Sequence, residues 1–216
     1  MTRVKICCMT TPEEVAMASE QGAYALGLVS AMPTGEGVIS DEKVAELSAL
    51  VPPGIRKFLL TSKTDAEGIA QQVKDAQTDT VQLVDRMSED TLKRLRELLP
   101  ETKLVQVVHV TGRDSIEEAV SMAVLADEIL LDSGQPDAEQ RSLGGTGNTH
   151  NWDYSAEIVR SLDKPVFLAG GLHPGNVTEA IRHVRPFGVD VCSRLRPNAR
   201  LDPALLRDFF QAVAAA

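Results

Sequence analysis

The feature that most constrains the fold of this chain is an alternation, repeated eight times, between a short apolar run and a longer amphipathic segment. The short runs have the usual length of β-strands, and the segments between them have the periodicity of helices that cover a core. Eight such units predict a parallel sheet, because each helix returns the chain to the same edge. The predicted strands are Val4–Cys7, Ala23–Val29, Arg56–Leu60, Thr80–Val84, Leu104–Val110, Glu128–Leu131, Pro165–Ala169 and Val189–Cys192.

A parallel sheet of this kind closes into a barrel or stays open as a doubly wound sheet, and the count of eight favours a (β/α)8 TIM barrel. No linker or shift in composition divides the chain, so we expect one domain over residues 1–216. Aromatic residues make up only 4% of a chain that is 43% hydrophobic, which predicts an aliphatic core typical of buried parallel strands.

Several predicted helices begin with a capping signal. Thr11 precedes Pro12 and Glu14, which places a cap, a first-turn proline and a capping-box acid in order. The segments 64–67 and 114–117 repeat this pattern, and Asp202 with Pro203 opens a last helix.

Charge and cysteine content exclude some classes of partner. The net charge of −9 argues against a non-specific nucleic-acid binder, which needs a basic face. No apolar run approaches the ~20 residues of a membrane span. Three cysteines, two of them adjacent, cannot all pair within the chain, so we expect a reduced, cytoplasmic compartment. The oligomeric state is left open between a monomer and a homodimer.

Glycines gather where a barrel binds its ligands. The connection from Ser133 to Asn151 is long enough to be functional, and in a barrel it follows the sixth strand on the catalytic face. It contains the run Gly144, Gly145, Thr146 and Gly147. Gly170 and Gly171 follow the seventh strand, and Ser193 and Arg194 follow the eighth, where barrels often hold a phosphate. We expect a phosphorylated small molecule to bind there.

Cys7 and Asp132 end the first and sixth predicted strands, on the same rim. A free cysteine is often only a small buried residue, and an acid after a strand is often only a turn former. Together, a thiol and a carboxyl group on one rim can act as base and acid on a small substrate. Cys8 is interpreted as structural or incidental. The four histidines have no paired spacing with each other or with a Cys-x-x-Cys motif, so no metal site is expected.

The sequence resembles the phosphoribosylanthranilate isomerase family of tryptophan biosynthesis along nearly its whole length. The matching segments, in order, are Lys5-Ile6-Cys7, Met9-Thr10-Thr11-Pro12-Glu13, Val81-Gln82-Leu83, Leu131-Asp132, Gly144-Gly145-Thr146-Gly147, Trp152, Leu168-Ala169-Gly170-Gly171-Leu172, Asn176-Val177 and Gly188-Val189-Asp190-Val191.

The resemblance implies an Amadori rearrangement of an N-ribosyl amine 5-phosphate to a 1-amino-1-deoxyribulose phosphate, with no metal or organic cofactor. It implies that Asp132 protonates the ring oxygen to open the sugar, and that Cys7, as a thiolate, then removes the proton on C2′. Lys5 lies two residues before Cys7 on the same strand face, so we expect it to lower the pKa of the thiol and to border the substrate.

The chain departs from the family pattern around the aglycone and the phosphate. The segment Met32–Gly37 has no arginine where the family has Ser-Pro-Arg, whose arginine holds the anthranilate carboxylate. Cys8 and Arg194 stand where the family has glycine, and Asn148 where it has lysine. Arg194 either distorts the phosphate turn, folds over the pocket or points to solvent. Arg194, Arg196 and Arg200 cluster after the eighth predicted strand and could compensate for the missing arginine.

These departures leave three hypotheses for the function. The first is phosphoribosylanthranilate isomerase itself or a close relative. The second is an aldose–ketose isomerase that acts on a different aminosugar phosphate. The third is a non-catalytic barrel that binds a phosphosugar, although the presence of both Cys7 and Asp132 argues against it.

Overall fold

The described residues of the computed structural model, 1–33, 35–134 and 150–216, form a closed barrel of eight parallel strands in sequence order. The strands are β1 (Arg3–Ile6), β2 (Ala25–Val29), β3 (Arg56–Thr61), β4 (Thr80–Leu83), β5 (Lys103–His109), β6 (Glu128–Asp132), β7 (Val166–Leu168) and β8 (Gly188–Val191). Each of the eight predicted strands is confirmed, with ends that differ by one or two residues. Cys7 consequently lies one residue beyond β1, and Asp132 is the last residue of β6.

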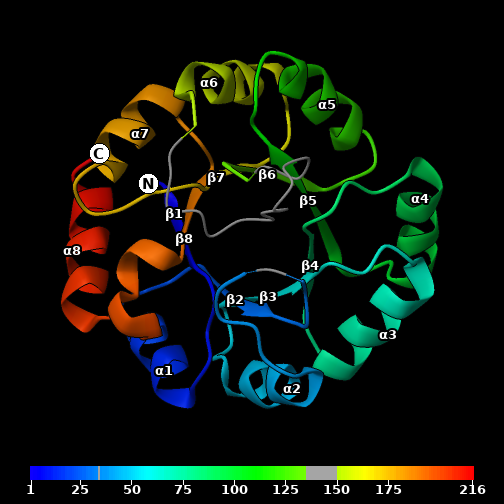
Figure 1. Ribbon diagram of the computed structural model, residues 1–216, viewed down its shortest axis with the longest axis horizontal. Helices are drawn as coiled ribbons and strands as arrows, with labels where there is room; N and C mark the ends of the chain where they lie inside the picture. Colours follow the sequence, from blue (N-terminus) through cyan, green and yellow to red (C-terminus); the bar gives the residue numbers. More distant parts are fainter. Residues whose placement is uncertain (34, 135–149) are drawn as a thin grey trace.

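In the described part of the chain, eight α-helices form a ring around the barrel (Figure 1). They are α1 (Pro12–Glu20), α2 (Asp41–Leu50), α3 (Ala66–Ala76), α4 (Glu89–Leu98), α5 (Asp114–Ala123), α6 (Trp152–Ser161), α7 (Val177–Val184) and α8 (Pro203–Ala214). Two short 3₁₀ turns, η1 (Ser193–Leu195) and η2 (Pro197–Ala199), lie between β8 and α8.

The capping signals place several helix starts correctly. The Thr11 hydroxyl accepts a hydrogen bond from the backbone N–H of Glu14, and Asp202 accepts from two backbone N–H groups of α8. The prediction for α5 is wrong in detail, because this helix begins at Asp114 after Arg113 without a side-chain cap.

Strand alternation divides the core into two hydrophobic layers. Val4 and Ile6 of β1 pack outward in the layer beneath the helices. The second layer fills the barrel itself and includes Cys7, Phe58 and Phe167. Because successive strand residues face opposite sides, the inward positions of β1 carry Lys5 and Cys7 to the carboxyl-terminal rim. The site therefore rests on a packed barrel core.

Candidate functional site

A pocket opens at the rim where the strands end. Its lining comes from all eight strands, at or just beyond their carboxyl ends, and from the loop after β2: Cys7, Cys8, Val29, Met32, Gly35, Glu36, Leu60, Gln82, Val84, Val107, Asp132, Ala169, Gly170, Gly171, Leu172, Asp190, Val191, Cys192 and Ser193. Both residues predicted as acid and base lie in this one pocket.

The Cys7 thiol lies at the base of the pocket and is the free, buried cysteine of the described chain. Space for its sulfur comes from Gly27 on the neighbouring strand β2. A Cβ atom at that position would lie 2.7 Å from Cys7 Sγ, so any larger residue there would displace the thiol.

Burial raises the pKa of Cys7 to about 11, although the nearby Lys5 ammonium lowers it and Asp190 raises it. The expectation that Lys5 leaves the thiol with a depressed pKa is therefore wrong: Lys5 acts in the predicted direction, but the loss of solvent outweighs it.

Lys5 lies beneath the pocket and is fully buried. It is the register partner of Asp190 across the seam between β1 and β8, and its Nζ lies 2.8 Å from Asp190 Oδ2. Burial alone would lower the pKa of Lys5, but Asp190 raises it above its ordinary value, so the ammonium keeps its charge. The structure thus corrects the expectation that Lys5 borders the substrate, because it is absent from the pocket lining and pairs with Asp190.

Asp132 lies at the rim, where its Oδ1 accepts a 2.7 Å hydrogen bond from the backbone N–H of Ser133. Burial raises the pKa of Asp132, and the Ser133 N–H and the nearby His109 oppose this shift. His109 is the register partner of Asp132 on β5, a proximity that the sequence pattern left undecided. A carboxyl group with a raised pKa retains its proton to higher pH, as a general acid requires.

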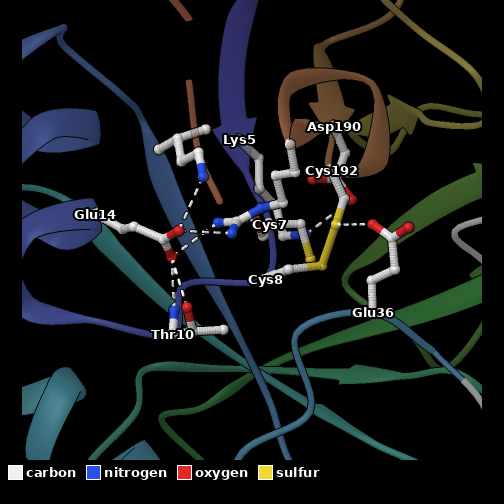
Figure 2. Close-up of a disulfide and its surroundings, with 10 residues drawn as sticks. Lys5, Cys7, Cys8, Thr10, Glu14, Glu36, Asp190 and Cys192 are labelled. Atoms are coloured by element: carbon white, nitrogen blue, oxygen red, sulfur yellow. Dashed lines mark hydrogen bonds and ion pairs between the residues drawn. A yellow bond between two sulfur atoms is a disulfide. The ribbon is translucent and has the colours of Figure 1, made fainter. Parts of the chain in front are cut away.

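The structure pairs Cys8 with Cys192 in a disulfide that joins the residues after β1 and after β8 (Figure 2). This corrects the expectation of fully reduced cysteines and the interpretation of Cys8 as incidental. Cys8 has a left-handed backbone with φ of 66°, a conformation that costs a non-glycine residue free energy. The bond closes a loop of 184 residues and forms one wall of the pocket.

Reduction of this disulfide is expected to lower the free energy of unfolding by about 2–4 kcal/mol, since the bond restricts the unfolded chain. Urea unfolding with and without a dithiol reductant measures the difference. A Cys8→Ser variant is the control, because its stability should not respond to the reductant. Equal stability of the oxidised and reduced wild type would contradict this role.

Arg196 and Glu14 form a buried ion pair, and Figure 2 shows Glu14 to one side of the disulfide. The guanidinium donates to both Glu14 oxygens at 2.8 and 3.1 Å, and to the backbone carbonyl of Cys7 at 3.4 Å. Glu14 also accepts hydrogen bonds from the backbone N–H groups of Thr10 and Leu201. Burial alone would raise the pKa of Glu14, but Arg196 and these N–H groups lower it below its ordinary value. Through this ion pair and the hydrogen bond to Cys7, Arg196 connects the segment after β8 with α1 and with the backbone of Cys7.

The expectation that Arg196 compensates for the missing arginine is therefore wrong, because its guanidinium is buried against Glu14. Arg194 lies in η1 with an exposed side chain and a backbone outside the left-handed region. This excludes the alternative in which Arg194 strains the turn.

Three of the residues predicted to bind phosphate, Gly170, Gly171 and Ser193, lie together in the pocket lining. Both glycines have positive φ, which only glycine adopts without strain. Gly144, Gly145, Thr146 and Gly147 lie outside the described residues.

Two absences concern only the described part of the chain. There, no group of three or more His, Cys, Asp or Glu side chains is arranged to hold a metal ion. None of the helices described is long and apolar enough to cross a membrane.

Sequence reasoning missed the wall of the pocket opposite the glycines. Met32, Leu60, Val84 and Val107 give this wall an apolar surface, and Glu36 stands at its rim. Strand alternation could have identified Val84 and Val107 as inward-facing. No sequence signal marks Glu36, because its place depends on the path of the loop after β2.

Comparison with known proteins matches the chain to N-(5′-phosphoribosyl)anthranilate isomerases. Residues 4–212 match the family model described as N-(5′-phosphoribosyl)anthranilate (PRA) isomerase. A protein of that name from Methanocella arvoryzae is 36% identical over 214 residues, which cover 99% of this chain and 98% of the relative. The crystal structure of phosphoribosyl anthranilate isomerase from Thermotoga maritima superimposes with a TM-score of 0.83 at 29% identity, and all of both chains is covered. Another isomerase of this name, solved with reduced 1-(o-carboxyphenylamino)-1-deoxyribulose 5-phosphate, gives a TM-score of 0.81 at 26% identity, again over both full chains.

Proposed function

The chain belongs to the N-(5′-phosphoribosyl)anthranilate isomerase family and has its aldose-to-ketose isomerase activity, and we propose that Asp132 and Cys7 are the acid and the base of this reaction. The observation that carries the assignment is the convergence of a carboxyl group with a raised pKa and a free thiol in one pocket.

In the first step, Asp132 donates its proton to the ring oxygen of the ribosyl group. The C1′–O bond breaks, and the nitrogen lone pair forms a C1′=N iminium. The raised pKa of Asp132 supports this role, because burial favours the protonated carboxyl group, which can give its proton to a weakly basic oxygen.

In the second step, Cys7 removes the proton from C2′, and the electrons of the C–H bond neutralise the iminium to give an enolamine. The enolamine takes up a proton at C1′, the hydroxyl group on C2′ gives up its proton, and the ketose results. The positive iminium beside the thiol opposes the effect of burial, which raises the pKa of Cys7, so the thiol can lose its own proton to water in the open pocket and act as the thiolate.

The rest of the pocket suits a phosphorylated sugar. Asp190 Oδ1 is buried and has no hydrogen-bond partner within the described residues, so a ribose hydroxyl can donate to it. Gly170, Gly171 and Ser193 are proposed to bind the phosphate through backbone N–H groups, as the loops after strands seven and eight do in many barrels. The exposed Arg194 in η1 is proposed to add positive charge at this edge.

The acid and base give a specific expectation for pH dependence. The reactive form carries a proton on Asp132 and none on Cys7, and burial raises the pKa of both groups, that of the thiol to about 11. The plot of kcat/KM against pH should therefore be bell-shaped and should not fall on its alkaline side until about pH 11. A fall that begins at pH 8 would contradict the assignment of the alkaline limb to Cys7.

The proposed function is tested by incubating the purified protein with N-(5′-phosphoribosyl)anthranilate and following the loss of its fluorescence. Chromatography of the product should show the 1-deoxyribulose phosphate. Fluorescence loss at the rate seen without enzyme would overturn the proposal. We also propose that the enzyme acts in the cytoplasm and that it is a monomer or a homodimer. Sedimentation of the purified protein distinguishes the two oligomeric states.

A further inference from the structure

Two links join the segment after β8 to the segment after β1. At the first link, Cys192 is bonded to Cys8 in the disulfide. At the second, further along the chain, Nη1 of Arg196 lies 2.8 Å from Oε1 of Glu14 on α1. The disulfide forms part of the pocket wall, whereas Arg196 is absent from the described pocket lining. Arg196 can therefore influence the reaction through the groups that it contacts, without touching the substrate.

One of these groups is the backbone of the proposed base. Among the described residues, the backbone hydrogen bonds between β1 and β8 end where the N–H of Cys7 donates to the carbonyl of Val191 at 2.9 Å. β8 stops at Val191 and the chain then turns into η1, so the strand does not extend alongside the Cys7 carbonyl. The guanidinium of Arg196 donates to that carbonyl through Nη2 at 3.4 Å. A side chain thus continues the support of β1 beyond the end of its neighbouring strand.

The surroundings of Arg196 fix the orientation of its guanidinium. Its side chain is only 2% exposed, and it donates to both carboxylate oxygens of Glu14, a geometry that defines direction as well as distance. Glu14 also accepts from the backbone N–H of Leu201, which holds the far end of the segment. Between these points Asn198 and Ala199 have left-handed backbones, with φ of 60° and 59°. Residues other than glycine keep this conformation only where the surrounding contacts enforce it.

We propose that Arg196 is a positioning residue for the base: by holding the carbonyl of Cys7, it fixes the place of the thiol relative to C2′ of the substrate. The carbonyl carbon and the side chain of Cys7 branch from the same Cα atom, so a shift of one moves the other. A displacement of ~1 Å in a reacting group can lower the rate by about 10²-fold. This inference rests on the proposed function, because it assumes that Cys7 removes the C2′ proton.

The test measures how the iminium divides between two products when cyanoborohydride is present with phosphoribosylanthranilate. Removal of the C2′ proton leads to the ketose, whereas transfer of a hydride to C1′ gives a stable amine. Mass spectrometry quantifies both, after subtraction of the amounts formed without enzyme. In Arg196→Lys the ratio of ketose to amine should fall about tenfold, because lysine keeps a cation for Glu14 but lacks the planar fork that also reaches Cys7.

The double variant Glu14→Leu/Arg196→Met leaves no charge unpaired and should show a similar fall in the ratio. Arg196 could instead serve only the stability of the fold. Its loss would then leave the ratio unchanged, because a smaller number of folded molecules lowers the amounts of both products together.

Arg96→Lys is the matched control. Arg96 also joins a carboxylate to a backbone carbonyl, those of Asp127 and Thr102, but it does so at the opposite end of the barrel, before β6 and β5. Its ratio should equal that of the wild type. An unchanged ratio in either folded variant of Arg196, with ketose formed by the wild type, would overturn the inference and leave the proposed function standing. If the wild type forms no ketose, the proposed function fails, and the inference fails with it.

Discussion

Cys7→Ser and Asp132→Asn are each expected to lower kcat/KM by about 10²–10⁴-fold, the usual cost of removing a positioned base or acid. A serine hydroxyl is a far weaker acid than a thiol, so it supplies almost no anion to remove the C2′ proton. Asparagine has the shape of aspartate but no proton of comparable acidity for the ring oxygen. Steady-state kinetics with phosphoribosylanthranilate measure both losses.

Both variants should keep the fold, because Cys7 and Asp132 line the pocket and each replacement preserves size. Circular dichroism and unfolding midpoints close to those of the wild type are the control. Near-wild-type turnover in either folded variant would eliminate the role assigned to that residue.

Glu14→Ala is expected to destabilise the protein by about 3–5 kcal/mol, because it leaves the buried Arg196 guanidinium without its partner. The backbone N–H groups of Thr10 and Leu201 lose their acceptor as well. Denaturant unfolding at neutral pH measures the loss. Since the pKa of Glu14 is lowered in the folded protein, the wild type should lose this contribution as the pH falls through the pKa of the carboxyl group in the folded protein.

The double variant Glu14→Leu/Arg196→Met tests whether the two side chains stabilise the protein as a pair. It should be more stable than the sum of the two single changes predicts, because no charge is then left unpaired. Strict additivity would show that the two side chains do not stabilise the protein as a pair.

The sequence was sufficient to predict the barrel and the convergence of its two reactive groups. Strand alternation places Lys5 and Cys7 on the inward face, and the closure of eight parallel strands brings Asp132 to the same rim. These features depend on local periodicity and on a topology that repeats around the barrel.

What the sequence could not predict depends on contacts between distant segments. Cys8 and Cys192 are 184 residues apart, and Glu14 meets Arg196 across a similar separation. The direction of the Cys7 pKa shift was predicted wrongly, because proximity to Lys5 is visible in the sequence whereas burial is not. Arg196 follows β8 as expected, but only the packed structure shows that its guanidinium pairs with Glu14 of α1 and does not line the pocket.

The assignment of Asp132 as the acid that opens the ring and of Cys7 as the base that acts afterwards is tested most directly by trapping the iminium. Cyanoborohydride added to the enzyme with phosphoribosylanthranilate reduces any open-chain iminium to a stable amine that mass spectrometry quantifies. In Cys7→Ser, Asp132 should still open the ring, so the trapped amine should form well above the rate without enzyme. In Asp132→Asn it should form no faster than without enzyme. Equal trapping by the two variants would contradict the account, because ring opening would then not depend on Asp132.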